Sequence, residues 1–245
     1  TTVKVQQGVA VGFIFRSGEL GELTVGTAGS DEYQGNGGND TFIAGAGDDI
    51  GDGGTGNDSM VGGAGSDSLI GNTGNDTIFG GDANSELNSG ADSIDAGAGD
   101  DSVIAGDGDD TVLAGAGQDT ISAGVGNDNL DAGDGNDSVT AGSGNDTLFG
   151  GAGNDYLDAG DGADSVDAGT GDDTVIGGTG NDTLTGGGGV DTLNYQAETS
   201  GVSINFETGV TTGVGSGTDS FSQFEYVLGG SGNDTIVGSG AANYV

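Results

Sequence analysis

The sequence predicts an all-β solenoid, and three observations lead to that fold class. A nine-residue unit, G-G-x-G-x-D-x-U-x with U aliphatic or aromatic, occurs nineteen times along the 245 residues. Its fourth position is always Gly and its sixth is always Asp. In twelve consecutive units the eighth position is aliphatic. A short period kept over most of a chain indicates a repeat architecture, in which each unit packs mainly on its neighbours.

The repeats form two blocks and a single late copy, with non-repeat segments around them. We expect a β-strand cap or assembly segment over 1–25, a first repeat block over 26–79, a loop insertion over 80–86, a second block over 87–194, a non-repeat β segment over 195–228 and a resumed repeat over 229–245. The seven inserted residues break the register, so we expect them to bulge from one edge as a loop.

Each unit divides into a turn of six residues and a strand of three. In the turn Gly53–Asp58, glycines stand where the backbone must take positive φ, and Asn or Asp at the fifth position tolerates the same region. In the strand Ser59–Val61, the middle side chain points toward a core. One buried residue in nine suits a coil of stacked strands. Two units would make one turn, so eighteen units give roughly nine turns and a rod about 40 Å long.

The eighth-position residues of the second block are the predicted core. They are Ile94, Val103, Val112, Ile121, Leu130, Val139, Leu148, Leu157, Val166, Val175, Leu184 and Leu193. In the first block, Gly51 takes a core position beside Ile50. A core position without a side chain predicts a local slip or void at that point.

Composition excludes several partners. The net charge is −38, with no His, Cys, Pro or Trp, and Lys4 and Arg16 are the only basic residues. An acidic, Gly-rich chain is typical of disorder, but a linker has no reason to place an apolar residue at every ninth position. Without a basic patch we expect no nucleic-acid partner. Without a long apolar run, and with repulsion from anionic lipid, we expect no membrane insertion.

The sixth-position carboxylates point to calcium. In a stacked coil they line up in two columns along the edges, where like charges repel unless cations lie between them. Carboxylate and Gly-turn carbonyl oxygens suit Ca²⁺, whereas Zn²⁺ would require the His or Cys that this chain lacks. Of the 40 carboxylates, Glu19 and Glu22 precede Gly26, which leaves 38. About one Ca²⁺ for each of nineteen Asp would add about +38, so calcium binding would be coupled to folding.

The predicted carboxylate ligands are the aspartates at the sixth position. They are Asp31, Asp40, Asp49, Asp58, Asp67, Asp76, Asp92, Asp101, Asp110, Asp119, Asp128, Asp137, Asp146, Asp155, Asp164, Asp173, Asp182, Asp191 and Asp234. An isolated G-x-D could simply cap its turn, but nineteen in register favour a ligand role.

The turns resemble a known family. Gly53–Met60 and Gly177–Leu184 are similar to the RTX (repeats-in-toxin) nonapeptide, and the similarity covers about 170 of the 245 residues. The resemblance implies a right-handed parallel β-roll that holds Ca²⁺ between successive turns, through the sixth-position Asp and turn carbonyls. The glycines that would offer carbonyls include Gly54, Gly56, Gly63, Gly65, Gly178 and Gly180.

One departure from the family pattern has a structural consequence. The first Gly is replaced by Ala in eight units of the second block, at Ala96, Ala105, Ala114, Ala123, Ala132, Ala141, Ala159 and Ala168. Because Ala disfavours positive φ, we expect this position to lie in an ordinary backbone region.

The two ends contain the non-repeat apolar residues. Residues 1–25 alternate as strands, which predicts a cap over the first coil or, alternatively, an assembly strand that docks on a neighbouring subunit. In 195–228 we expect a strand over Val202–Phe206. The predicted anchors of that segment are Phe221, Phe224 and Tyr226.

Three functions fit this sequence. We favour a secreted calcium-dependent structural protein of the cell surface, such as a surface-layer, matrix or filament subunit, which joins copies of itself through the chain ends. The alternatives are the C-terminal module of a secreted enzyme or toxin, and an extension segment of a large adhesin. The resemblance implies export by a type I secretion apparatus and an extracellular or bacterial cell-surface location.

We do not expect an enzyme within these residues. The chain has no His and no Cys to act as base or nucleophile. The Asp48-Asp49 and Asp109-Asp110 pairs could imitate an acid/base pair. Because such pairs recur at fixed repeat positions, we interpret them as turn residues.

Overall fold

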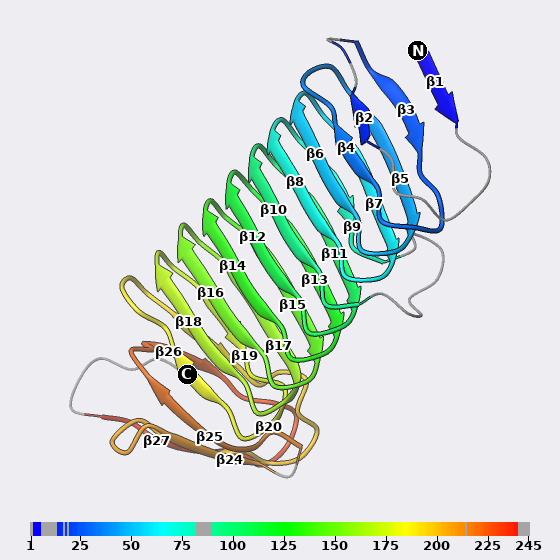
Figure 1. Cartoon of the computed structure of the whole chain (residues 1–245). Helices are drawn as coiled ribbons and strands as arrows, with labels where there is room; N and C mark the ends of the chain where they lie inside the picture. Colours follow the sequence, from blue (N-terminus) through cyan, green and yellow to red (C-terminus); the bar gives the residue numbers. More distant parts are fainter. Residues whose placement is uncertain are drawn as a thin grey trace.

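The protein is a rod of stacked β-strands, seen from the side in Figure 1. The computed structural model describes residues 2–5, 14–16, 18, 20–81, 90–213 and 215–239. Over these ranges all regular structure is β, with no helix. Through the repeats, successive strands alternate between two sheets.

Within the described ranges the first sheet contains thirteen strands, most of them separated by one strand of the other sheet. They are β1 (Thr2–Val5), β3 (Glu22–Val25), β5 (Thr41–Ala46), β7 (Ser59–Ala64), β9 (Thr77–Phe79), β11 (Ser102–Asp107), β13 (Thr120–Val125), β15 (Ser138–Ser143), β17 (Tyr156–Gly162), β19 (Thr174–Ile176), β22 (Thr192–Asn194) and β26 (Tyr226–Leu228), with β20 (Thr179–Gly180) beside β17.

The second sheet contains fourteen strands in the part of the chain that the structure describes. They are β2 (Ile14–Arg16), β4 (Glu32–Gln34), β6 (Ile50–Thr55), β8 (Ser68–Thr73), β10 (Ser93–Ala98), β12 (Thr111–Ala116), β14 (Asn129–Asp134), β16 (Thr147–Ala152), β18 (Ser165–Thr170), β21 (Thr183–Thr185), β25 (Gly217–Ser222), β24 (Val210–Gly213), β23 (Ser203–Asn205) and β27 (Thr235–Val237).

The register confirms the predicted fold class. Each repeat strand pairs in parallel with the strand one turn later, so that Leu130 lies opposite Leu148 and Ile121 lies opposite Val139. The step is eighteen residues, or two units, in both sheets. Stacking at this step gives a parallel β-solenoid of about nine turns, consistent with a β-roll.

The insertion changes one step of the coil without disturbing its neighbours. Leu69 pairs with Ile94 and Ile78 with Val103, a step of 25 residues in place of eighteen. The N–H groups of Gly80 and Gly81 donate to two carbonyls of strand β11, those of Ile104 and Ala105. The remainder of the predicted loop, residues 82–86, lies outside the described residues.

The strands are longer than the sequence predicted, and each unit contributes two buried residues to the core in place of one. Most repeat strands have six residues and continue through the first three positions of the next unit. In β14 both Leu130 and Ala132 are fully buried, as are the corresponding residues of the neighbouring strands. The prediction of one buried residue in nine was therefore wrong: the eighth and first positions both face the core. None of the first-position Ala residues has positive φ, as expected.

Gly51 causes no slip, contrary to the prediction. It pairs with Tyr33 on one side and with Leu69 on the other, in the same register as the rest of the sheet. A Cβ at Gly51 would lie 3.1 Å from the side chains of both Leu69 and Phe42. Phe42 reaches this space from the opposite sheet and stacks on Tyr33, with ring centroids 4.8 Å apart. Larger neighbours fill the position that Gly51 leaves open.

The N-terminal segment continues the coil. Strand β1 pairs in parallel with β3, and β2 pairs in parallel with β4, so these residues add a turn to the two sheets. The choice between a cap and an assembly strand remains a prediction.

The C-terminal segment departs from the parallel coil. Strands β23, β24 and β25 pair antiparallel, and β27 then adds to β23. Strand β23 falls within the predicted Val202–Phe206. Phe221 and Phe224 are buried as expected, but Tyr226 is 36% exposed, so it is not an anchor. The adjacent Val227 takes the core position of that strand.

No helix in the described part of the chain is long and apolar enough to cross a membrane.

Two neighbouring residues of β16 separate core from surface. Leu148 is fully buried, whereas Phe149 is 43% exposed. We expect Leu148→Ala to lower the free energy of unfolding by about 2–5 kcal/mol, because it removes packed atoms and leaves a cavity. Phe149→Ala should change it by less than about 1 kcal/mol. Urea unfolding at saturating calcium measures both, and equal losses would contradict this assignment of the two faces.

Candidate metal-binding site

The sixth-position aspartates form two columns along the rod. The Asp31 column contains Asp31, Asp49, Asp67, Asp92, Asp110, Asp128, Asp146, Asp164 and Asp182. The Asp40 column contains Asp40, Asp58, Asp76, Asp101, Asp119, Asp137, Asp155, Asp173 and Asp191. The columns arise because units of the same sheet stack in register, as the sequence predicted.

Hydrogen bonds fix one oxygen of each carboxylate. The N–H of Asp110 donates to Oδ1 of Asp128 at 2.9 Å, and the N–H of Asp128 donates to Oδ1 of Asp146 at 2.8 Å. The same bond recurs turn after turn in both columns. All eighteen residues of the two columns are at most 3% exposed. The fold itself therefore holds these carboxylates away from solvent.

The other carboxylate oxygen accepts no hydrogen bond in most of these residues. In sixteen of the eighteen, Oδ2 is buried and has no hydrogen-bond partner. Oδ2 of Asp182 faces the start of its own turn, where a Cβ on Gly177 would lie 2.7 Å away. A buried anionic oxygen without a donor is unfavourable by several kcal/mol. Each of these oxygens requires a cation or a proton.

The pKa values follow from this burial. Desolvation is the largest cause and raises the pKa of four aspartates to about 7: Asp92, Asp101, Asp128 and Asp182. It raises the pKa of Asp164 to about 6. The backbone N–H on Oδ1 opposes the shift, and neighbouring carboxylates add to it. Folding without a cation would thus favour protonated carboxyl groups near neutral pH.

The turn carbonyls differ in their availability. The fourth-position Gly56 has φ 128°, and its N–H donates to the Thr73 carbonyl at 2.8 Å. Its own carbonyl accepts no hydrogen bond from a described residue. By contrast, the second-position Asn36 carbonyl accepts from the N–H of Thr55 at 3.1 Å. Gly65, next to the insertion, is a fourth-position exception, because its carbonyl accepts from the N–H of Gly90 at 2.7 Å. Fourth-position carbonyls such as that of Gly56 are therefore the more accessible oxygens.

The remaining glycines whose carbonyls were predicted as calcium ligands lie in turns of the same kind. Gly54, Gly63 and Gly178 are at second positions, with φ of 99°, 109° and 87°. Gly180 is at a fourth position, with φ 135°, and pairs with Gly162.

The donor set fits calcium. Among the described residues no three acidic side chains come together as a metal cluster. Each turn supplies one buried carboxylate, so neighbouring carbonyls must complete any coordination shell. An all-oxygen set of carboxylates and carbonyls is the set that Ca²⁺ prefers.

The fifth-position residues form a second, exposed ladder. The N–H of Asn127 donates to Oδ1 of Asp109 at 2.8 Å, and the N–H of Asn145 donates to Oδ1 of Asn127 at 2.9 Å. The prediction that fifth-position Asn and Asp take the left-handed region was wrong. The non-Gly residues with positive φ in the described ranges are Asn36, Asn72 and Gln223, and none of them is at a fifth position. Asn and Asp are used there because a short side-chain oxygen reaches the next turn.

Two acidic residues outside the predicted set extend the columns. The N–H of Asp182 donates to Oδ1 of Asp219 at 3.2 Å, and the N–H of Asp191 donates to Oε2 of Glu225 at 2.9 Å. A signal for Asp219 was present in the sequence. Residues 214–222 carry Gly, Gly, Asp and Phe at positions two, four, six and eight, and lack only the first Gly. Glu225 has a weaker signal, a core-type Val227 two residues later.

Asp234 lies apart from both columns. It is only partly buried, and its Oδ1 accepts from the N–H of Val202 at 3.0 Å. Its unit belongs to the pairing of β27 with β23.

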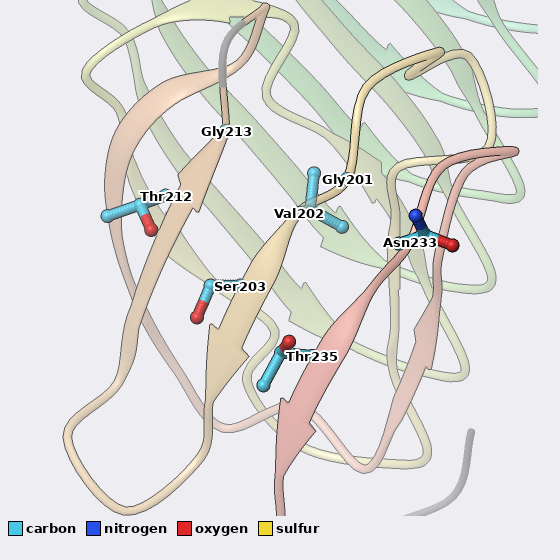
Figure 2. A pocket seen from close by; sticks show the side chains of 7 residues that line it. All are labelled: Gly201, Val202, Ser203, Thr212, Gly213, Asn233 and Thr235. Carbon is cyan, nitrogen blue, oxygen red and sulfur yellow. The ribbon is translucent and has the colours of Figure 1, made fainter.

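A shallow hollow occurs beside the same strands, as Figure 2 shows. Its lining consists of Gly201, Val202, Ser203, Thr212, Gly213, Asn233 and Thr235. The lining contains no carboxylate and no base, so it offers neither metal ligands of the column type nor an acid/base pair.

Comparison with known proteins agrees with this geometry. The sequence model of the RTX calcium-binding nonapeptide repeat matches residues 25–60, 52–87, 86–121, 104–139, 122–157, 131–166, 140–175, 167–197 and 223–245. These matches cover well over half of the chain and confirm the resemblance. Such repeats bind calcium, belong typically to secreted proteins, and are typically non-catalytic. No curated protein matches the chain.

A test of the ligand assignment compares two aspartates of one repeat. Asp164 is buried with an unpartnered Oδ2, whereas Asp167 is exposed on the strand that follows. We expect Asp164→Asn to raise the calcium concentration at half-folding several-fold, because it removes an anionic oxygen from the column. Asp167→Asn changes net charge equally and should leave that midpoint within about twofold. Calcium titrations followed by circular dichroism decide between them, and equal shifts would contradict the ligand assignment.

A further prediction concerns the dependence of folding on pH without calcium. Folding raises the pKa of Asp92, Asp128 and Asp182 from 3.8 to about 7. The folded state therefore binds more protons, and its stability falls as pH rises through 6–7. In excess chelator we expect β structure to increase as pH is lowered from 8 to 5. A far-ultraviolet circular dichroism signal that stays constant over this range would count against buried, proton-binding carboxylates.

Proposed function

The chain belongs to the RTX calcium-binding nonapeptide repeat family, and from this we propose that it is a secreted structural protein of the bacterial cell surface, a subunit of a surface layer, matrix or filament. Its β-roll folds when calcium occupies the two columns. The sixteen buried aspartates with an unpartnered Oδ2 are the proposed side-chain ligands, together with turn carbonyls such as that of Gly56.

Calcium also accounts for a secreted location. A chain with 40 carboxylates and two basic residues repels itself when compact. Where calcium is scarce it would remain unfolded, which suits export by a type I apparatus as an extended chain. Where calcium is abundant, metal binding would supply the free energy of folding.

The uncovered strand edges at the two ends of the rod support a role in joining copies of the chain. At one end no described strand covers the outer edges of β1 and β2, and at the other none covers β26 and β27. Such edges present backbone donors and acceptors to a further strand. Most described residues between them serve the coil itself (Figure 1). We therefore assign 1–25 and 195–245 to contacts between copies, and the repeat blocks to the calcium-bound shaft.

Sedimentation tests this proposal. With chelator we expect an expanded monomer, and with millimolar calcium a compact rod whose sedimentation coefficient rises with protein concentration. Val237, 39% exposed on the edge strand β27, should be part of the contact, so Val237→Lys should weaken association. Ile104→Lys, at a site 41% exposed on the shaft strand β11, is the matched control. A strictly monomeric rod at all concentrations in calcium would favour the secretion-module or adhesin alternatives instead.

A further inference from the structure

The last carboxylate of the Asp31 column differs from those before it. Oδ1 of Asp219 accepts from the N–H of Asp182, as elsewhere in the column. Its Oδ2, however, accepts from the Tyr195 hydroxyl at 2.7 Å and from the Thr211 hydroxyl at 2.8 Å. All three residues are buried, with 3% or less of each exposed. Two protein hydroxyl groups thus lie where the interior carboxylates of this column have no donor.

The first carboxylate of the same column is closed in a similar way. Oδ2 of Asp31 accepts from the N–H of Thr27 at 2.6 Å and from the Thr27 hydroxyl at 3.0 Å. Between Asp31 and Asp219, eight carboxylates have a buried Oδ2 without a partner. Those eight are Asp49, Asp67, Asp92, Asp110, Asp128, Asp146, Asp164 and Asp182. The difference between ends and interior is therefore one of hydrogen bonding, within a single ladder.

The fold positions the C-terminal donors. Thr211 lies on β24, directly opposite Asp219 in the antiparallel pair with β25. Tyr195 is held by its own N–H, which donates to the Leu228 carbonyl at 2.8 Å. Burial and the Asp219 charge raise the pKa of Tyr195, so its phenol stays protonated and remains a donor. The departure from parallel pairing thus places hydroxyl groups on the end of the column.

We propose that Asp31 and Asp219 are end caps of the column and not calcium ligands. Protein donors take the place of the cation at both ends, and calcium occupies only the interior of the column. The inference rests on the proposed calcium-dependent fold. It revises the expectation that every repeat aspartate is a ligand, because the oxygen of Asp31 that would face a metal is already used.

Counting bound ions by native mass spectrometry tests the proposal. Asp219→Asn and Asp164→Asn make the same isosteric change at the end and in the interior of one column. We expect Asp164→Asn to lose at least one calcium ion relative to the unchanged chain, and Asp219→Asn to lose none. If Asp219→Asn loses as many ions as Asp164→Asn, the proposal is wrong. An unchanged chain that binds no calcium would overturn the proposed function instead, so the two failures are distinguishable.

A second variant keeps the carboxylate and removes its donors. In Tyr195→Phe/Thr211→Val, Oδ2 of Asp219 would resemble an interior oxygen, and we expect one additional calcium ion per chain. This variant decides the question if Asp219→Asn does not fold, as judged by circular dichroism in calcium. An ion count equal to that of the unchanged chain would show that the hydroxyl groups do not replace a cation, and would overturn the proposal.

Discussion

The structure depends on one buried oxygen in each half-turn. Oδ2 of a repeat aspartate, such as Asp128, is removed from water and receives no hydrogen bond from the protein. Its partner Oδ1 is held by the preceding turn, so the carboxylate cannot rotate outward without breaking that bond. A fold that repeats this arrangement sixteen times is stable only when something positive occupies the turns. In the proposed calcium-bound form, the ion is therefore part of the core in the same sense as the aliphatic residues.

The other positions of the nonapeptide serve the same stacking. At the second position, Gly178 has φ 87°, and a Cβ there would clash with the Gly160 carbonyl of the preceding turn. Turns approach one another backbone to backbone because strands on either side stack at about 4.8 Å. Glycine allows that approach, and the approach brings carbonyl oxygens beside the carboxylates. The turn that requires glycine and the site that requires oxygen are one feature.

Much of this was predictable because the period is strict. Two units per turn fixed both sheets, and the seven inserted residues simply lengthen one step, since Leu69 still pairs with a core residue, Ile94. The failures have physical reasons. Ala132 looked like a substituted turn glycine, but it is a second core residue. Gly51 looked like a defect, but side chains of neighbouring strands fill its space. The sequence did not predict Asp219 because it lies 37 residues after Asp182 and so falls outside the regular spacing. It did not predict Glu225 because little of a repeat unit precedes that residue.

Two ladders of opposite direction join each turn to the next. In the inner ladder an N–H donates toward the C-terminal turn, as from Asp110 to Asp128, and in the outer ladder toward the N-terminal turn, as from Asn127 to Asp109. A turn ordered by calcium therefore positions a carboxylate or an amide for both neighbours, and order spreads along the rod as in other one-dimensional repeat proteins. Such spreading requires a boundary. Hydroxyl groups at Asp31 and Asp219 provide one, because a carboxylate already satisfied by the protein does not require a further ion beyond it.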